Sequence, residues 1–576
     1  MDITKILEQQ TKKVIKDLYN LDFDAFLIEH PQNEDFGDFA LNAGMMLAKQ
    51  LNKNPMLISE ELVIAFKDNI EAFKTYDLPI FSKIYAVQPG FINFVLSPEW
   101  LLYQLKNINV AYSSEPINEK ILIEYSQPNP NKPQHIGHAR NNFLGSSLAN
   151  IYKYLGSDVV KANYFNDWST AICKSMLIYD KYFKDQEPTK KSDHFIGDMY
   201  IRYSKEEEEN PAVKEEVQAM FQKLENGDPY VLSLWKKVTN WAYGGWKQTY
   251  KNQNVDFDVI FTQSDYKDSG KEVVDIALKK GIAEKDETGA IVARLEKYGL
   301  PDKVLLRSDG TSIYITQDLQ LAKDTFAKYA LDKRLYVVDN RQSDYFKQLF
   351  KIFEILGFDF AKKIHHVSYG FVSLPEGQMS SRTGLVINAD DAYETVKKVE
   401  EEEIEKSIRN ITNKEDTVNK ISLAAFRYGI LKIDPKKDVV FKYDQITKFE
   451  GNTGPYLLYT YARMNSVLEK SGVSITGLFL PENLLESLEP KENALLRHLY
   501  KFDETVLQAG MEYSPHIIAN YLFELCQRFN SFYATLSVLD AKSEEKKILR
   551  LLLTAKTANV LNTGLGLLGI NTVAKM

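Results

Sequence analysis

One change of pattern, within residues 120–165, constrains the fold more than any other feature of the chain. Lys120–Ser126 is an apolar stretch of strand length, a loop rich in Pro and Asn follows it, and apolar residues then recur at helical spacing over Ile136–Leu155. Gly156 ends that helix, and Val159–Phe165 has the composition of a second strand. Because a strand, a helix and a second parallel strand form a right-handed βαβ unit, the sequence predicts a parallel sheet here.

The segments around this unit predict an α+β start and a helical end. Residues 1–111 combine helical periodicity, near 3–18 and 41–51, with two short strands in 84–96 that break at Pro89-Gly90. Further strands are expected at Val304–Arg307, Ser312–Thr316, Arg334–Val338 and His366–Val372, and a mostly helical insertion at about 180–255. The remainder is helical and predicts a bundle. Two acidic runs are expected to be solvated helix faces, Glu206–Glu209 and Glu400–Glu403.

The composition fits several ordinary folded domains and excludes some classes of protein. At about 100–200 residues per domain, 576 residues predict three to five domains. The 71 basic against 79 acidic side chains give a net charge of −8, which argues against a surface that binds nucleic acid everywhere but allows a local basic face. With two cysteines, neither a disulfide framework nor a Cys-based zinc site is supported, and a reducing, cytoplasmic compartment is expected. No apolar run approaches the roughly 18 residues of a membrane helix, and the first residues do not have the pattern of a secretion signal.

The loop and helix start of the βαβ unit carry the strongest chemical signal. Parallel sheets bind ligands at the carboxyl ends of their strands, and a helix N-terminus offers unpaired N–H groups that suit phosphate. His135 and His138 stand three residues apart, where both can donate hydrogen bonds to phosphate, and Gly137 lets a nucleotide approach the backbone. Composition predicts only about 0.005 chance matches to His-x-Gly-His. Two histidines that cap or pack the helix start, or half of a metal site, are the alternatives.

These residues also carry a resemblance. His135-Ile136-Gly137-His138 resembles, letter for letter, the HIGH signature of the class I aminoacyl-tRNA synthetases. Gln378-Met379-Ser380-Ser381-Arg382-Thr383-Gly384 resembles their second signature, KMSKS, although alone it is typical of a polar turn. The strings Glu124–Arg140 and Leu306–Asp318, with Asp35-Phe36-Gly37-Asp38, resemble the arginyl-tRNA synthetases in particular, and this resemblance covers nearly the whole chain.

The resemblance implies a multidomain α/β protein. Residues 1–111 would be an N-terminal α+β module that binds the tRNA elbow, and 112–390 a Rossmann-like catalytic domain with the parallel sheet and the helical insertion. A helical connector at 391–440 would lead to an all-α helical bundle that binds the anticodon, at 441–576. The implied enzyme is a monomeric arginine–tRNA ligase with no membrane partner. It would use ATP to activate L-arginine to arginyl-adenylate and then charge the terminal adenosine of tRNA(Arg).

The residue chemistry separately favours arginine as the substrate. A planar guanidinium pairs with a carboxylate in bidentate geometry, and Asp318, beside the hydroxyl of Tyr314, can supply that carboxylate. Such a buried pair would discriminate against neutral amino acids. The alternative is that Asp318 caps the helix that follows it. By resemblance, Glu124, Asn129 and Gln342 would hold the amino and carboxylate groups of arginine.

The resemblance assigns other residues to ATP, which would arrive with Mg²⁺ as a substrate complex. No tightly bound cofactor and no resident metal are expected. His135 and His138, with Gly137 between them, would lie at the α-phosphate and ribose. Lys132 would grip the β- and γ-phosphates together with the second signature, through Met379, Ser380, Ser381 and Arg382.

Two pairs of residues are candidates for tRNA binding. Phe91 and Asn93 match positions at which the family stacks on and hydrogen-bonds a D-loop base, and a core position for Phe91 is the alternative. Tyr459 and Arg463 share one face of a predicted helix. Stacking plus a cation would suit anticodon bases there, and a packed aromatic face is the alternative.

The sequence departs from the family pattern mainly at glutamines. Gln378 and Ser381 replace the signature lysines of the second loop, and Lys132 matches a lysine that relatives use in compensation. Glutamine also replaces a usual serine, arginine and glutamate, at Gln127, Gln317 and Gln263 in that order. Gln263, Gln317 and Gln378 leave open a catalytically weak relative that only binds tRNA. A class I ligase for another basic amino acid, such as lysine, is a further alternative.

Overall fold

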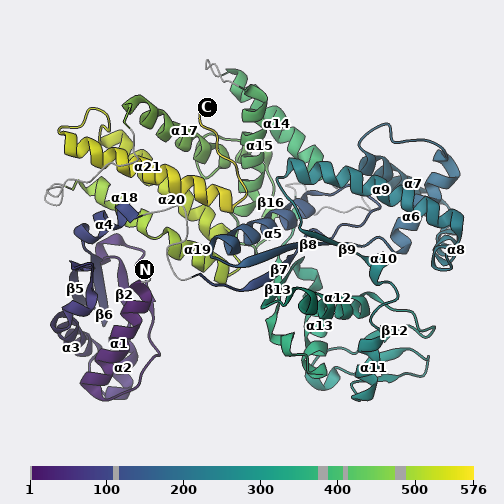
Figure 1. The fold of residues 1–576 in the computed structure, drawn as a ribbon, viewed down its shortest axis with the longest axis horizontal. Coiled ribbons are helices and arrows are strands. Elements are labelled where there is room, and N and C mark those ends of the chain that lie inside the picture. Colours follow the sequence, from purple (N-terminus) through teal and green to yellow (C-terminus); the bar gives the residue numbers. More distant parts are fainter. Residues whose placement is uncertain (1–2, 108–115, 374–386, 407–412, 474–487) are drawn as a thin grey trace.

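The structure, a computed structural model, describes residues 3–107, 116–373, 387–406, 413–473 and 488–576. Figure 1 shows three parts in chain order: an N-terminal module, a central sheet with its helices, and a group of helices at the end of the chain. The N-terminal module lies beside the C-terminal helices, and the helical insertion projects at the opposite end of the molecule (Figure 1).

The N-terminal module is an antiparallel sheet in the order β1-β2-β6-β5, covered by helices. Its elements are α1 (Ile3–Tyr19), β1 (Ile28–Glu29), β2 (Phe39–Leu41), α2 (Ala43–Leu51), α3 (Pro55–Asp68), β3 (Lys74–Thr75), β4 (Leu78–Pro79), β5 (Phe81–Val87), β6 (Phe91–Leu96) and α4 (Pro98–Asn107). The predicted helices and the predicted break between two strands at Pro89-Gly90 are confirmed. Phe94 of β6 is buried against Phe66 of α3, so α3 covers one face of the sheet.

The predicted βαβ unit is present and forms the middle of the central sheet. It consists of β7 (Lys120–Glu124), α5 (Ile136–Tyr154) and β8 (Asp158–Phe165). Three further parallel strands complete the order β14-β13-β7-β8-β9: β9 (Val259–Thr262), β13 (Lys333–Asp339) and β14 (Ile364–Tyr369). The sheet therefore grows from β7 in two directions, and the strand order reverses between β7 and β13. Open parallel sheets bind ligands at such a point, beyond the carboxyl ends of the strands.

Both faces of the central sheet are covered. Ile121 and Ile123 of β7 join the core that includes α5 and the C-terminal helices. Leu122, which points the other way, joins a second core with α12 (Tyr314–Tyr329) and α13 (Ser343–Leu356). An apolar run without alternation in β7 is the pattern expected of a strand buried on both sides.

Of two neighbouring strand predictions, one is wrong and one is confirmed. Ser312–Thr316 is not a strand, because beyond one isolated bridge from Ser312 to Leu306 the chain enters α12 at Tyr314. Its β-branched residues favour a strand locally, but the helix buries Ile315 and Leu319, one turn apart, in the core. Val304–Arg307 does contain a strand, β12 (Lys303–Leu306). That strand belongs to a separate antiparallel sheet with β10 (Ala283–Lys285) and β11 (Ile291–Ala293).

Helices build the insertion and the end of the chain, as predicted. The insertion holds α6 (Thr170–Ile178), α7 (Ser192–Glu209), α8 (Val213–Glu225) and α9 (Pro229–Asn252), and α10 (Gln263–Tyr266) and α11 (Lys271–Lys279) follow β9. The C-terminal helices are α14 (Ala389–Lys406), α15 (Lys414–Leu431), α16 (Tyr443–Ile446), α17 (Gly454–Ser471), α18 (Pro490–Tyr500), α19 (Phe502–Met511), α20 (His516–Thr535) and α21 (Glu544–Leu567). A short parallel pair, β15 (Val372–Ser373) with β16 (Val439–Val440), ties them to the central domain.

The prediction of a solvated acidic face is wrong for Glu400. This side chain is fully buried on α14, and its two carboxylate oxygens have no hydrogen-bond partner among the described residues. Burial raises the pKa of Glu400 to about 8. In the part of the chain that the structure describes, no helix is long and apolar enough to cross a membrane.

Candidate active site

A cavity of about 950 Å³ opens at the carboxyl ends of β7 and β13, beside the start of α5. Its lining brings together most of the residues that the sequence singles out: Glu124, Asn129, Lys132, His135, Gly137, His138, Tyr314, Asp318 and Gln342. Those residues come from the loop after β7, the first turn of α5, the start of α12 and the turn after β13. The predicted second signature, with Gln378, Met379, Ser380, Ser381 and Arg382, lies outside the described residues.

The chain leaves β7 through a turn that directs the following loop to the cavity. Ser126 and Gln127 have φ angles of 82° and 46°, a region that residues other than glycine rarely adopt. Side-chain oxygens hold both residues there: the Ser126 N–H donates to Asn141 Oδ1 at 2.7 Å and the Gln127 N–H to Asn163 Oδ1 at 3.0 Å. The Gln127 side-chain amide in turn donates to Glu124 Oε1 at 3.2 Å. Backbone strain at this turn is therefore held in place by α5 and β8.

His135 and His138 cap α5 and also line the cavity. Nδ1 of His135 accepts the Gly137 N–H at 3.1 Å, and Nδ1 of His138 accepts the His135 N–H at 3.1 Å. These two bonds assign the ring proton of each neutral histidine to Nε2. Burial, and then neighbouring positive groups, lowers the pKa of His135 to about 4 and holds the pKa of His138 well below its usual range. Both rings are therefore neutral near pH 7, and each has its Nε2–H to donate. The capping alternative is correct, and it is compatible with ligand binding.

Positive groups surround the start of α5. Lys132 lines the cavity, and burial lowers the pKa of its ammonium group. Arg341, which sequence reasoning missed, lines it too, donates to both oxygens of Asp339 at 3.1 and 2.9 Å, and lies 4.4 Å from the centre of the Phe371 ring. The N–H groups of the first turn of α5 all donate within the chain, so the unpaired donors expected from the sequence are not present there. The two side-chain charges and the helix dipole are what favour an anionic ligand. Arg341 could have been found, because it follows β13 at the same edge of the sheet as Gln342.

Asp318 lies with tyrosines in the part of the cavity formed by α12 and α13. It accepts a hydrogen bond from the hydroxyl of Tyr345. The helix begins at Tyr314 with Ile313 as its N-cap, so the alternative that Asp318 caps the helix is wrong. Burial raises the pKa of Asp318 to about 7, the Tyr345 bond opposes this shift, and the charge of Glu124 adds to it. A cation bound beside this carboxyl would stabilise its charged form.

The charge of Glu124 is balanced by a buried arginine. Arg334 of β13 is fully buried and donates to Glu124 Oε2 at 2.5 Å. Next to this pair, Tyr164 and Tyr336 line the cavity, and within the described chain the buried hydroxyl of neither has a hydrogen-bond partner. Buried hydroxyls without partners are rare in folded proteins, so this part of the cavity is suited to a polar ligand. No local motif marks these tyrosines or Tyr345, because only the fold brings them to the cavity.

The two candidate tRNA pairs have different surroundings. Phe91 is half-buried on β6, whereas Asn93 is only 3% exposed, and no described residue hydrogen-bonds to its Oδ1. On α17, the Arg463 guanidinium carbon lies 4.9 Å from the centre of the Tyr459 ring, and Arg463 donates to Asn530 Oδ1 of α20 at 2.7 Å. Both side chains of the second pair are half-buried, so part of each faces solvent.

Two of the glutamine departures lie outside the cavity lining. Gln263 begins α10 and Gln317 lies in α12, and both side chains are buried. Over the ranges that the structure covers, Oε1 of neither glutamine has a hydrogen-bond partner.

Three families match successive parts of the chain. The arginyl tRNA synthetase N-terminal domain matches residues 2–96, the tRNA synthetases class I (R) catalytic domain matches residues 102–443, and the DALR anticodon binding domain matches residues 457–576. The order of these matches is the order of the three parts in Figure 1.

Whole-chain comparisons agree with these matches. The arginine–tRNA ligase of Bacteroides thetaiotaomicron is 39% identical over 562 residues and covers 92% of both chains, and that of Phocaeicola vulgatus is 36% identical over 617 residues and covers 100% of both. The solved arginyl-tRNA synthetase of Thermus thermophilus has a TM-score of 0.85 and 26% identity over 100% of both chains. The enzyme from Plasmodium falciparum shares the fold, with a TM-score of 0.81 at 22% identity over 100% of this chain and 99% of the other. The chain therefore belongs to the arginyl-tRNA synthetases, within the class I tRNA synthetases.

Proposed function

We propose that the 950 Å³ cavity is the place where this arginyl-tRNA synthetase activates arginine and charges tRNA(Arg). The chain is an arginine–tRNA ligase, and its reaction has two steps. A carboxylate oxygen of arginine attacks the α-phosphorus of ATP, which forms arginyl-adenylate and releases pyrophosphate. The 2′-hydroxyl of the terminal adenosine of tRNA then attacks the activated carbonyl and releases AMP. The observation that carries the proposal is that one cavity joins a carboxyl suited to guanidinium with two neutral imidazole donors at a helix start.

In the arginine pocket, Asp318 pairs with the substrate guanidinium. The planar guanidinium can donate two hydrogen bonds to the Asp318 carboxylate. The hydroxyls of Tyr314, Tyr164 and Tyr336 offer further acceptors. Glu124, Asn129 and Gln342 hold the amino and carboxylate groups, with Arg334 balancing the charge of Glu124. A neutral amino acid would leave Asp318 buried without a cation, so it is rejected.

In the ATP pocket, catalysis is positioning plus stabilisation of developing phosphate charge. His135 and His138 donate their Nε2–H groups to the α-phosphate and ribose region, and Gly137 lets the nucleotide approach the helix start. Lys132 grips the β- and γ-phosphates with Met379, Ser380, Ser381 and Arg382 of the second signature. Mg²⁺ arrives with ATP as part of the substrate, and no tightly bound cofactor takes part.

The tRNA follows a path from the N-terminal module to the C-terminal bundle. The module, 1–111, binds the tRNA elbow through Phe91 and Asn93, the catalytic domain is 112–390, and the connector is 391–440. The bundle at 441–576 contacts the anticodon through Tyr459 and Arg463. The partly exposed ring beside a guanidinium at the second pair supports stacking on a base. The enzyme acts as a monomer in the cytoplasm.

Arginine-dependent ATP–pyrophosphate exchange, with and without tRNA, tests this proposal. Exchange that requires arginine is expected, and relatives commonly need tRNA for adenylate formation. No exchange even with tRNA present would favour the weak, tRNA-binding relative, and exchange with lysine in place of arginine would favour a ligase for another basic amino acid.

A further inference from the structure

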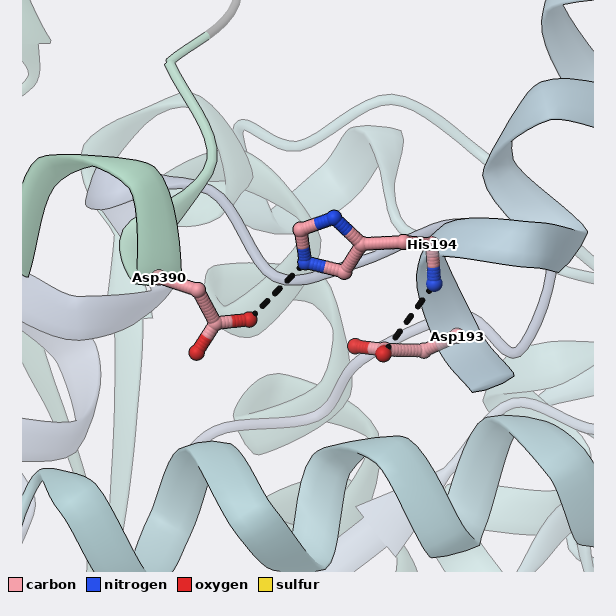
Figure 2. Close-up of side chains that lie close together, drawn as sticks. All are labelled: Asp193, His194 and Asp390. Atoms are coloured by element: carbon pink, nitrogen blue, oxygen red, sulfur yellow. Dashed lines mark hydrogen bonds and ion pairs between the residues drawn. The ribbon is translucent and has the colours of Figure 1, made fainter. Parts of the chain in front are cut away.

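Asp390, in the first turn of α14, belongs to a polar cluster outside the cavity lining. Figure 2 shows its carboxylate turned toward the imidazole of His194. Its Oδ2 accepts hydrogen bonds from His194 Nε2 at 3.0 Å, Lys191 Nζ at 2.7 Å and Thr249 Oγ1 at 3.2 Å. Lys191 also donates to Asp193 Oδ2 at 3.0 Å. The Lys191 ammonium thus supplies a positive charge between the two carboxylates, and we interpret the cluster as an ion-pair network.

The cluster joins α14 to the helical insertion. Lys191, Asp193 and His194 stand at the start of α7, and Thr249 belongs to α9. The side chain of Asp193 is completely buried against the backbone of α9, where a Cβ at Gly245 would lie 2.2 Å from its Oδ1. Glycine is therefore required at that point of α9, and the contact fixes the position of the cluster on the insertion.

The residues directly before Asp390 pair with the first signature. The Ile136 N–H donates to the Ile387 carbonyl at 3.1 Å, and the Ala389 N–H donates to the Gln134 carbonyl at 2.8 Å. His135 forms an antiparallel bridge with Asn388 between these two bonds. The backbone of His135 is thus held by a short strand-like pairing whose far end is Asp390.

The insertion also reaches the loop before His135 directly. Gly197 of α7 lies so close to Pro133 that a Cβ there would be 2.6 Å from the proline ring. Trp246 of α9 donates its indole N–H to the Lys132 carbonyl at 3.4 Å. Helices α7 and α9 therefore contact residues 132–133 directly, and Asp390 ties the same helices to the segment 387–389 that pairs with residues 134–136.

We propose that Asp390 and His194 are positioning residues for adenylate formation, which lock the helical insertion to α14 and thereby fix His135 at the α-phosphate of ATP. The inference rests on the proposed role of His135. It goes beyond that role because it gives the insertion a task in the chemical step, separate from binding arginine or tRNA. Neither Asp390 nor His194 lines the cavity, so both act through His135.

The test is a double-mutant cycle in arginine-dependent ATP–pyrophosphate exchange with tRNA present. Asp390→Asn removes the charge of the side chain and keeps its shape. It should lower kcat about tenfold or more and leave the KM for arginine within about twofold of the wild type. The reason is that a small displacement of a positioned group slows the chemical step and leaves the binding of arginine unchanged. Asp198→Asn is the control, because Asp198 lies on α7, the helix that carries His194, in an exposed pair with Lys190 at 2.5 Å. Its kcat should stay within about twofold of the wild type.

The cycle partner is His135→Asn, which keeps a capping side chain and loses the imidazole. If Asp390 acts through His135, Asp390→Asn slows adenylate formation in the wild type but changes it less than about twofold in the His135→Asn background. Single-turnover measurements with enzyme in excess keep slow variants measurable. Equal slowing in both backgrounds would overturn the inference. So would a rise in the KM for arginine as large as the fall in kcat.

Two further results keep the outcome clear. If the melting curve shows that Asp390→Asn does not fold, two variants of His194 are compared instead. His194→Ala should slow exchange. His194→Gln can still donate to Asp390 and should keep most of the wild-type exchange rate. Restoration by Gln supports the inference, and equal loss with both substitutions contradicts it. Failure of the wild type to exchange would refute the proposed function, whereas an active wild type with a fully active Asp390→Asn variant would refute only this inference.

Discussion

Asp318 should make the binding of arginine depend on pH in a range where arginine itself keeps its charge. Its carboxyl has a pKa of about 7, raised first by burial, and it must be ionised to pair with a guanidinium. The guanidinium stays protonated throughout, because its own pKa is above about 12. His135 and His138 stay neutral at these pH values, because their pKa values are lowered, so they add no slope.

The size of the effect follows from the fraction of ionised carboxyl. With a pKa of about 7, the apparent dissociation constant is multiplied by about 11 at pH 6 and by about 1.1 at pH 8. Arginine should therefore bind about tenfold more weakly at pH 6 than at pH 8, which is a difference of about 1.4 kcal/mol in binding free energy. Binding should also release about 0.9 proton at pH 6 and about 0.1 at pH 8, since the bound state holds the carboxylate.

Isothermal titration calorimetry at pH 6, 7 and 8, in buffers of different ionisation enthalpy, measures both quantities. Asp318→Asn should bind arginine much more weakly and lose the pH dependence. Asp344→Asn is the matched control, because Asp344 is exposed on the neighbouring α13 and pairs only with Lys347 in the described structure. Affinity that is flat between pH 6 and 8 in the wild type, or the same slope in Asp318→Asn, would refute the reasoning.

Three other perturbations have definite expected outcomes. Glu400 has a carboxyl pKa of about 8 in the native protein against 4.5 ordinarily, so the native state holds the proton and stability falls as pH rises from about 4.5 to 8. Glu400→Gln should remove this slope and raise the melting temperature most above pH 8, and an unchanged pH dependence of melting would contradict it. Arg334→Ala leaves Glu124 buried without its partner and should lower the unfolding free energy by about 3–5 kcal/mol in denaturant titrations, whereas a change below about 1 kcal/mol would mean that the pair is not desolvated. His138→Ala should chiefly slow adenylate formation and leave tRNA affinity in filter binding nearly unchanged, so loss of tRNA binding would argue against a phosphate role.

The βαβ unit and the cavity residues near it could be predicted because their signals are local. The apolar run of β7, the helical spacing of α5 and the glycine that ends the helix, Gly156, all lie within one short segment and can be recognised without knowing the rest of the fold. The Ser312–Thr316 prediction failed because β-branched residues favour a strand until tertiary packing is known, and here the burial of Ile315 and Leu319 decides for a helix. Glu400 failed for a related reason, since a run of acids carries no sign of which member faces the core.

Other parts of the site have no local signal at all. Tyr164, Tyr336 and Tyr345 line the same cavity as Asp318 from β8, β13 and α13, which the fold brings together across almost two hundred positions. The order of strands in a sheet depends on contacts between distant parts of the chain. Without knowing that order, these hydroxyls cannot be assigned to one pocket from the sequence. The contacts of Asp390 could not be predicted either, because its partners Lys191 and His194 lie in the helical insertion, and the sequence gives no signal for where the insertion packs.

The reciprocal cap of α5 has a consequence for how the enzyme spends free energy. A free imidazole interconverts between two tautomers and rotates about its side-chain bonds. In His135 and His138 the bonds that start the helix also choose the tautomer and the ring orientation, so this choice is made once, when the chain folds. No reorganisation of either donor is then needed at each turnover, which is the condition under which fixed dipoles stabilise a transition state best. A substitution at either position therefore removes one bond of the helix start and one donor to the ligand together.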